Sequence, residues 1–449
     1  MGKYFGTDGF RGEANVTLTA DHAYKIGRFL GYYFRRDDGK KARIVMGKDT
    51  RLSSYMLEYA IAAGICASGG DVYMLHVTTT PSVSYVCRLD GFDCGIMITA
   101  SHNPYTDNGI KIISTHGEKL DDKTTEEIEK YIDSTEELPL ARGENIGRVV
   151  DYVSGRNRYL GYLISLASNS YKDLKIGLDS ANGASWNLAR SVFGALGAKL
   201  YTVGCEPNGT NINRGCGSTH VEELCRLVRE KHLDMGFAFD GDCDRCIAVD
   251  EAGQVVDGDK IMYILARRLR DRGMLWGDTV VATVMSNSGF FRSLEDAGMR
   301  CVTTKVGDRF VYECMQKENY ALGGEQSGHI IMRKYATTGD GILTAIMVCE
   351  EICDKKSTLA ALAHPVNLYP QYTKNVRVKD KSAAVSNEKV KETLGEVEKL
   401  IDGRGRVLIR ESGTEPVIRI MTECESEKIC REYAEKIADV MESEGLVCG

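Results

Sequence analysis

The sequence of 449 residues has little proline, no long apolar run and no excess of positive charge. Its seven prolines leave little room for disordered linkers. No stretch offers the ~20 apolar residues of a membrane-spanning helix, and the start, MGKYFGTDGF, lacks a signal-peptide core and the myristoylation pattern. A net charge of −7 argues against the broad basic face that nucleic acids require. We therefore expect a cytoplasmic protein with neither a membrane nor a nucleic-acid partner.

Cysteine, in contrast, is abundant. The chain has 15 cysteines, and many lie inside apolar segments, such as Cys66 in AIAAGICASG and Cys349 in LTAIMVCEEIC. Thiols in such segments behave as small hydrophobic side chains. An odd number scattered in this way indicates a reducing compartment rather than a disulfide scaffold.

A chain of this length exceeds the usual limit for one hydrophobic core, so two to four domains are expected. Strand-like and helix-like segments alternate in three successive rounds, which is typical of βαβ units. From about Tyr369 the order changes to that of a smaller α+β domain. The fold class is therefore α/β, with three related α/β domains at 1–152, 153–255 and 256–367 and a C-terminal α+β domain at 368–449 around a central cleft.

A serine closes one of the apolar strand-like segments. CGIMITAS ends at Ser101, which places this residue at the carboxyl end of a strand, where open α/β sheets bind their ligands. With His102 and Lys111 close by in the sequence, Ser101 could act as a nucleophile or carry a phosphoryl group. A turn rich in Ser, Asn, Pro and Gly, without catalytic function, is the alternative.

Three aspartates alternate in the stretch FAFDGDCDRC: Asp240, Asp242 and Asp244. In an extended chain their carboxylates project to one side, and a divalent cation relieves their repulsion. Oxygen ligands favour magnesium, manganese or calcium over zinc. An EF-hand is disfavoured because Arg245 stands where the calcium loop needs glycine, and because strand-like segments flank the stretch. Its single CxxC lacks the second ligand pair of a zinc site.

Two further loops are suited to polar ligands. GGEQSGH offers Glu325 and Ser327 to sugar hydroxyl groups, although a polar hairpin without a ligand fits the same residues. IRESGTEPVIR combines backbone amides and hydroxyl groups with Arg410 and Arg419, which suits the binding of a phosphate. The alternative is a surface turn between two strands that binds no ligand. The sequence contains no GxxxxGK[ST], which excludes a P-loop kinase. Together the loops predict an enzyme that acts on a sugar phosphate.

The chain resembles the α-D-phosphohexomutase superfamily. The signatures FGTDGFRG, TASHNP, DGDxDR, GEQSGH and RESGTEP occur in order between Phe5 and Arg419. Within that superfamily NINRGCGSTH (211–220), TTKVGDRFV (303–311) and TTGDGILTA (337–345) resemble the phosphoglucosamine mutase branch. The resemblance implies a heart-shaped, four-domain isomerase, a monomer or homodimer, that interconverts glucosamine 6-phosphate and glucosamine 1-phosphate for UDP-N-acetylglucosamine and cell-wall synthesis.

The resemblance also implies the cofactors and the role of each site residue. Ser101 would be a phosphoserine that makes a bisphosphorylated sugar, with one Mg²⁺ per chain and a hexosamine or hexose 1,6-bisphosphate as activator. The metal ligands would be Ser101, Asp240, Asp242 and Asp244. The catalytic residues would be Ser101, His102, Lys111, Arg11 and Arg245. The substrate-binding residues would be Glu325, Ser327, Lys305, His329, Arg410, Ser412, Gly413, Thr414 and Arg419.

Three positions depart from the family pattern. Cys243 stands where Gly or Ala is common, and an exposed thiol with a lowered pKa would make the metal site sensitive to oxidation. Thr79 replaces a proline and Lys48 replaces an arginine.

Three other hypotheses for the function remain: a phosphomannomutase or phosphoglucomutase of the same superfamily, a phosphatase with Asp240 as its nucleophile, and a structural module that binds calcium.

Overall fold

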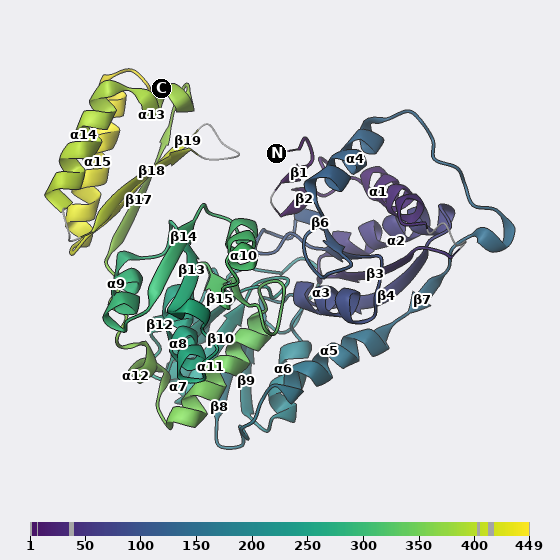
Figure 1. The fold of residues 1–449 in the computed structure, drawn as a ribbon, viewed down its shortest axis with the longest axis horizontal. Helices are drawn as coiled ribbons and strands as arrows, with labels where there is room; N and C mark the ends of the chain where they lie inside the picture. Colours follow the sequence, from purple (N-terminus) through teal and green to yellow (C-terminus); the bar gives the residue numbers. More distant parts are fainter. Residues whose placement is uncertain (1, 7, 36–39, 402–404, 412–416, 449) are drawn as a thin grey trace. The chain divides into compact units, whose positions relative to one another are not determined.

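The computed structural model describes residues 2–6, 8–35, 40–401, 405–411 and 417–448. The chain forms two compact units, of which the first comprises Met1–Met285 and Met299–His364 and the second Ser286–Gly298 and Pro365–Gly449. Three mixed sheets, each with its own helices, lie in the first unit, and one antiparallel sheet lies in the second (Figure 1). No helix formed by the described residues is long and apolar enough to cross a membrane.

The first sheet has seven strands in the order β1-β2-β6-β5-β3-β4-β7. They are β1 (Phe5–Gly6), β2 (Gly9–Glu13), β3 (Arg43–Lys48), β4 (Asp71–Val77), β5 (Cys94–Ile98), β6 (Asp107–Ser114) and β7 (Val149–Asp151). The helices are α1 (Ala20–Tyr33), α2 (Leu52–Ala67), α3 (Thr80–Leu89) and α4 (Asp122–Asp133), with a 3-10 turn at Gly143–Asn145. Along β3, Ile44 and Met46 pack with α1, α2 and α4, whereas Val45 packs with α3. This alternation puts helices on both faces of the sheet.

The second sheet has the order β12-β11-β10-β8-β9. Its elements are α5 (Val153–Ser165), β8 (Lys175–Asp179), α6 (Leu188–Ala195), β9 (Lys199–Val203), α7 (Glu222–Lys231), β10 (Met235–Phe239), β11 (Cys246–Asp250) and β12 (Val255–Val256). Leu224 and Val228 of α7 pack against Ala238 and Val249 of the sheet. Burial of these apolar side chains holds the helix on the sheet.

The third sheet has the order β14-β13-β15-β16. Its elements in the first unit are α8 (Gly258–Asp271), a 3-10 turn (Trp276–Asp278), β13 (Thr279–Thr283), β14 (Arg300–Thr304), α10 (Asp308–Lys317), β15 (Leu322–Gly324), β16 (Ile330–Met332), α11 (Gly341–Lys355) and α12 (Leu359–Ala363). Helix α9 (Ser288–Asp296), which follows β13 in the chain, lies in the second unit.

One topology recurs in all three sheets. The orders β6-β5-β3-β4, β11-β10-β8-β9 and β16-β15-β13-β14 repeat the same arrangement. In each, three strands that come one after another in the chain are parallel, and the next strand in the chain pairs antiparallel at the edge of the three. Each antiparallel strand begins after a loop, at 99–106, 240–245 and 325–329. The three loops carry Ser101, the three aspartates and the EQSGH residues, so the repeat places the predicted site residues at equivalent positions.

The second unit contains β17 (Gln371–Arg377), β18 (Arg406–Glu411) and β19 (Val417–Glu423), in the antiparallel order β17-β19-β18. Its other helices are α13 (Lys381–Ser386), α14 (Glu388–Ile401) and α15 (Glu427–Ser443). Ile418 and Ile420 of β19 form a buried core with Ile437 and Met441 of α15. The predicted fold class, three related α/β domains and a C-terminal α+β domain, is confirmed.

Candidate active site

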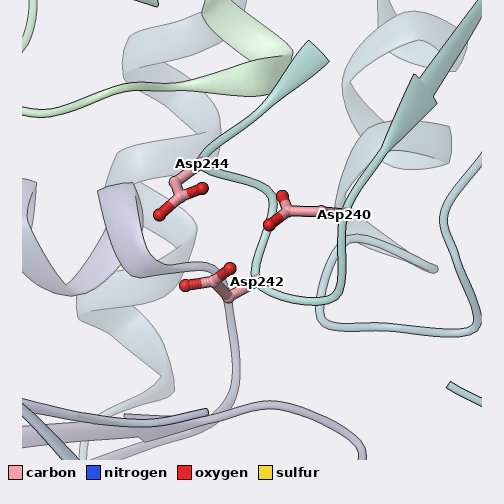
Figure 2. Close-up of side chains that lie close together, drawn as sticks. All are labelled: Asp240, Asp242 and Asp244. Atoms are coloured by element: carbon pink, nitrogen blue, oxygen red, sulfur yellow. The ribbon is translucent and has the colours of Figure 1, made fainter. Parts of the chain in front are cut away.

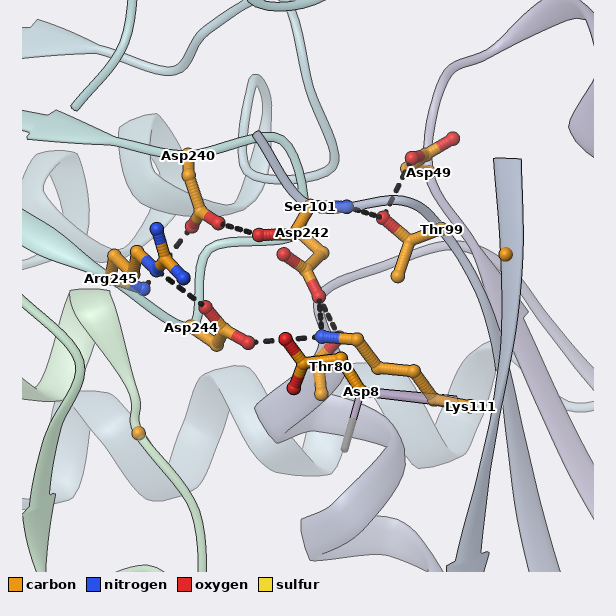
Figure 3. A network of polar contacts seen from close by, with 12 residues as sticks. Asp8, Asp49, Thr80, Thr99, Ser101, Lys111, Asp240, Asp242, Asp244 and Arg245 are labelled. Carbon is orange, nitrogen blue, oxygen red and sulfur yellow. Dashed lines mark hydrogen bonds and ion pairs between the residues drawn. The ribbon is translucent and has the colours of Figure 1, made fainter. Parts of the chain in front are cut away.

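Ser101 faces the aspartate loop of the second domain. Its Oγ donates a hydrogen bond to Asp240 Oδ2 at 2.6 Å (Figure 3). The residue is 1% exposed and has a φ of 51°, a left-handed conformation that is unfavourable for a residue with a Cβ. Strain of this kind often occurs at functional residues. The first and second domains therefore meet at a buried hydroxyl and a carboxylate.

Arg51 and Asp49 support the Ser101 loop, and sequence analysis missed both. Arg51 Nη2 donates to the carbonyl oxygens of Ser101 at 3.0 Å and Asn103 at 2.9 Å, and its Nε donates to Asp49 at 2.8 Å. Asp49 also accepts from Thr99 Oγ1 at 2.8 Å, and this hydroxyl accepts from the Ser101 N–H at 3.0 Å. Both charged side chains are fully buried. The only sequence signal was a charged Asp-Thr-Arg directly after a buried strand.

Asp240, Asp242 and Asp244 cluster in the loop between β10 and β11 (Figure 2). All three are buried, and one oxygen of each lies within 4.8 Å of the others. Burial and the two neighbouring carboxylates raise the pKa of Asp240 well above its ordinary value. Among the described residues, Asp242 Oδ1 and Asp244 Oδ1 have no hydrogen-bond partner. Buried carboxylate oxygens of this kind fit a divalent metal ion.

Lys111, on β6, neutralises part of this cluster. Its Nζ donates to Asp242 Oδ2 at 2.7 Å and to Asp244 Oδ2 at 3.0 Å (Figure 3). Burial alone would lower the pKa of Lys111, but the two carboxylates outweigh it and raise the pKa above its ordinary value. Thr80, at the start of α3, donates its hydroxyl to Asp242 Oδ2 at 2.5 Å. The first domain thus contributes an ammonium group and a hydroxyl to the aspartate loop.

The GGEQSGH loop of the third sheet pairs with the aspartate loop. Arg245 and His329 form an antiparallel β-bridge, and His329 Nδ1 lies 3.6 Å from Asp244 Oδ1. Burial opposes protonation of His329, but nearby carboxylates raise its pKa to about 9. The Gly339 N–H nevertheless donates to His329 Nε2 at 3.0 Å. Because a protonated Nε2 could not accept this bond, the geometry favours a neutral ring with its proton on Nδ1.

Other predicted residues of the first unit lie near these loops or on the surface. His102 Nδ1 is 3.3 Å from Ser101 Oγ, and burial, assisted by Arg245 and Arg11, lowers the pKa of His102 to about 4. Its ring is therefore neutral at pH 7. Arg11, on β2, forms an ion pair of 3.2 Å with Asp8.

The third-domain residues differ in exposure. Glu325 accepts a hydrogen bond of 3.1 Å from the Gly307 N–H, and burial raises the pKa of this carboxyl. Ser327 and Lys305 are exposed. The structure thus brings Ser101, the aspartates, Lys111, Arg245, His102 and His329 together and leaves Ser327 and Lys305 accessible.

Lys119 is a further residue that sequence analysis missed. Its Nζ contacts Asp8 Oδ1 at 3.0 Å and Asp308 Oδ1 at 2.6 Å, which joins the first domain to α10. A cavity of about 420 Å³ is lined by the three residues of this bridge together with Lys111 and Asp244. No local sequence pattern marked Lys119, because its partners lie far away in the chain.

In the second unit, Arg410 and Arg419 occupy directly opposed positions of β18 and β19. Like charges in such positions repel each other, and burial together with Arg419 lowers the pKa of Arg410. A bound anion would relieve this repulsion. The predicted residues Ser412, Gly413 and Thr414 lie outside the described residues.

All three departures from the family pattern lie among the described residues. Cys243 is fully buried with a φ of 60°, which explains why glycine suits this position. Burial raises the pKa of its thiol well above the ordinary value, so neither condition for sensitivity to oxidation is met. Lys48 forms a buried ion pair with Glu58. Thr79 caps α3 by accepting a hydrogen bond from the Ser82 N–H at 3.3 Å.

Comparison with known proteins identifies the family. Models of phosphoglucomutase/phosphomannomutase match the chain in order, as α/β/α domain I at 2–139, domain II at 157–253, domain III at 257–369 and the C-terminal domain at 374–440. The chain is 57% identical over 448 residues to a phosphoglucosamine mutase of Lachnospira eligens, with 99% of each chain covered. It is 48% identical over 445 residues to a phosphoglucosamine mutase of Bacillus subtilis, again with 99% of each covered.

Solved structures show the same fold at low sequence identity. A phosphoglucomutase/phosphomannomutase family protein of Burkholderia thailandensis has a TM-score of 0.80 at 23% identity, covering 99% of this chain and 98% of that one. The N-acetylphosphoglucosamine mutase of Aspergillus fumigatus, in complex with GlcNAc-6P and magnesium, has a TM-score of 0.65 at 17% identity, covering 98% and 96%. With its four domains and its full-length relatives, the chain belongs to the phosphoglucosamine mutases, a branch of the phosphoglucomutase/phosphomannomutase family.

Proposed function

We propose that this chain interconverts glucosamine 6-phosphate and glucosamine 1-phosphate through a phosphoserine at Ser101. The observation that carries the proposal is the 2.6 Å contact between the buried Ser101 Oγ and Asp240, inside a cluster of three carboxylates. A phosphoryl group on this oxygen would lie against the aspartates, where its charge requires a cation. Identities of 57% and 48% to two phosphoglucosamine mutases support the choice of substrate.

Asp240, Asp242 and Asp244, with the phosphate on Ser101, would hold one Mg²⁺. When bound, the cation withdraws charge from the phosphoryl group during transfer. The buried oxygens Asp242 Oδ1 and Asp244 Oδ1, which lack hydrogen-bond partners among the described residues, support this assignment. The related A. fumigatus mutase, whose structure was solved in complex with magnesium, supports it as well.

The transfer itself involves one bond broken and one formed. The oxygen of a sugar hydroxyl attacks the phosphorus, and the bond from phosphorus to Ser101 Oγ breaks. The proton leaves the sugar hydroxyl and reaches the departing Ser101 Oγ by way of Lys111 or Arg11, either of which gives up one proton as it accepts another, and the second transfer reverses this movement when it regenerates the phosphoserine. Arg245 and the neutral His102 bind the phosphoryl oxygens. The bisphosphorylated sugar reorients between the two transfers, so no net phosphate is consumed.

The remaining predicted residues bind the parts of the substrate that do not react. Glu325, Ser327, Lys305 and His329 bind the sugar, and their mixture of acceptors and donors suits a polyol in either orientation. A separate group binds the non-reacting phosphate, whose binding energy positions the reacting end. This group comprises Arg410, Arg419, Ser412, Gly413 and Thr414. A hexosamine or hexose 1,6-bisphosphate rephosphorylates Ser101 when the phosphate is lost.

We assign these roles to four domains, at 1–152, 153–255, 256–367 and 368–449. The first carries the phosphoserine, the second the metal ligands, the third the sugar-binding loop and the fourth the phosphate clamp. We place the enzyme in the cytoplasm, where it supplies the precursor of UDP-N-acetylglucosamine. The presence of 15 free cysteines supports a reducing compartment.

Steady-state kinetics with glucosamine, glucose and mannose 6-phosphates test the substrate. We expect the highest kcat/KM for glucosamine 6-phosphate. A higher kcat/KM for glucose 6-phosphate or mannose 6-phosphate would instead indicate a phosphoglucomutase or a phosphomannomutase. The Ser101→Ala variant should lose nearly all mutase activity. If Asp240 were instead the nucleophile of a phosphatase, this variant would still release inorganic phosphate from the sugar phosphate.

A further inference from the structure

Asn213 connects the second domain to the Ser101 loop. It belongs to the motif NINRGCGSTH, which lies between β9 and α7 and has no part in the proposed chemistry. Its Nδ2 donates hydrogen bonds to the carbonyl oxygens of Ser101 at 2.8 Å and Asn103 at 2.9 Å. The residue is 8% exposed, and its own N–H donates to the Ala181 carbonyl at 2.8 Å. Asn213 is therefore held in place by its own domain while it binds the backbone of another.

The same two carbonyl oxygens also accept hydrogen bonds from Arg51, at 3.0 and 2.9 Å. Each oxygen thus has two donors, one from the first domain and one from the second, which uses both of its lone pairs. Gly241 of the aspartate loop closes the remaining side, because a Cβ at this position would lie 2.4 Å from the Ser101 oxygen. The carbonyl of Ser101 is enclosed on all of these sides.

The direction of this carbonyl helps to fix the backbone of Ser101, from which Oγ projects. A peptide unit is planar, so fixing the Ser101 oxygen fixes the plane that joins Ser101 to His102. Ser101 has a φ of 51°, which is unfavourable for serine and persists only where the surroundings impose it. In this conformation its Oγ lies 2.6 Å from Asp240 Oδ2, and His102 Nδ1 lies 3.3 Å from the same Oγ.

We infer that Asn213 is a positioning residue for phosphoryl transfer, which holds the strained backbone of Ser101 so that Oγ faces the metal-binding aspartates. The inference rests on the proposed phosphoserine. An asparagine amide suits this role because its NH₂ group has two hydrogens, one for each carbonyl oxygen. An aspartate would present an oxygen to two oxygens, and an alanine would leave both acceptors to Arg51 alone.

The test measures phosphoryl transfer in full-length Asn213→Ala, Asn213→Asp and Asn208→Ala variants. Asn208 is exposed in the same connection, and its Oδ1 accepts hydrogen bonds only from Thr210 among the contacts of the described residues, so Asn208→Ala is the matched control. Each protein is mixed with glucosamine 1,6-bisphosphate and Mg²⁺, and the rate at which the Ser101 peptide gains phosphate is followed by rapid quenching and mass spectrometry. Steady-state kcat and KM, and Mn²⁺ affinity by titration, are measured in parallel.

We expect both Asn213 variants to transfer phosphate about 10- to 100-fold more slowly, since a shift of ~1 Å in a reacting group has an effect of this size. KM should stay within about twofold of the wild type, because the sugar-binding residues lie in other loops, and Asn208→Ala should behave like the wild type. If the alanine variant fails to fold, the aspartate variant, which has the same volume, provides the same test.

A transfer rate like that of the wild type in either folded Asn213 variant would overturn the inference, even if the variant unfolds at a lower temperature. A failure of the proposed function is distinct, because in that case the wild-type protein itself would gain no phosphate at Ser101. Equal losses of the transfer rate in Asn208→Ala and Asn213→Ala would also overturn the inference, because they would show that any change in this connection slows the transfer.

Discussion

Replacement of Gly241 by alanine tests how closely the aspartate loop approaches Ser101. An added Cβ would lie 2.4 Å from the Ser101 carbonyl oxygen, 2.9 Å from Ile212 Cδ1 and 3.1 Å from Asn213 Nδ2. The first of these atoms belongs to the backbone and is held by Arg51 and Asn213, so it cannot move without breaking hydrogen bonds. The glycine is therefore required by the contact between the two loops.

The expected magnitude follows from this distance. Real Cβ contacts are essentially never shorter than 3.0 Å, so the two loops must separate by about 0.6 Å or more. Overpacking of this kind destabilises a protein by about 1–3 kcal/mol. The same shift would lengthen the 2.6 Å contact between Ser101 Oγ and Asp240, and we expect kcat to fall by about 10- to 100-fold.

Thermal unfolding and mutase kinetics of Gly241→Ala check both effects. The matched control is Gly161→Ala, at a solvent-exposed position in the middle of α5, where an added Cβ meets no atom within 4 Å. This control should keep full activity and gain about 0.5–1 kcal/mol, because alanine is the better helix residue. If Gly241→Ala matched the wild type in stability and kcat, the close approach of the two loops would be wrong.

Three further predictions concern the metal, the arginine pair and the buried thiol. Asp242→Asn should weaken Mn²⁺ binding, measured by titration, by at least about tenfold, since one buried negative ligand is lost; unchanged affinity would place the metal elsewhere. Arg410→Ala should raise KM for glucosamine 6-phosphate about tenfold or more, because a cationic group that binds the phosphate is lost. The free energy of unfolding should change by less than about 1 kcal/mol, because the cross-strand repulsion with Arg419 is removed at the same time. An unchanged KM would argue against a phosphate clamp. In the native protein Cys243 should resist thiol reagents that label the half-buried Cys66, and mass spectrometry of the labelled peptides checks this; equal labelling would contradict its burial.

Much of the fold could be predicted from the sequence. Apolar strands alternating with amphipathic helices indicated three α/β rounds, and the changed pattern after Tyr369 indicated the C-terminal domain. Ser101 and the three aspartates were found because each stands in a polar stretch directly after an apolar strand. These signals are local, so they survive in a single sequence.

The residues that support the site could not be predicted in this way. Arg51 binds backbone carbonyl groups about 50 residues away, Asp49 accepts a hydrogen bond from Thr99, 50 residues away, and Asn213 is 112 residues from Ser101. Lys119 bridges two aspartates that are 111 and 189 residues away from it. None of these contacts leaves a periodic pattern, because the partners are far apart in the chain and, for Arg51 and Asn213, are backbone carbonyls, which every residue has. They emerge only when the three repeated loops are brought together in space.

The most direct test of the account is the intact mass of the protein before and after incubation with glucosamine 1,6-bisphosphate and Mg²⁺. We predict the gain of one phosphate on the peptide that contains Ser101, and its loss when glucosamine 1-phosphate or glucosamine 6-phosphate is added. The Ser101→Ala variant should gain no phosphate. A phosphate on Asp240, or a wild-type protein that gains none, would contradict the phosphoserine mechanism.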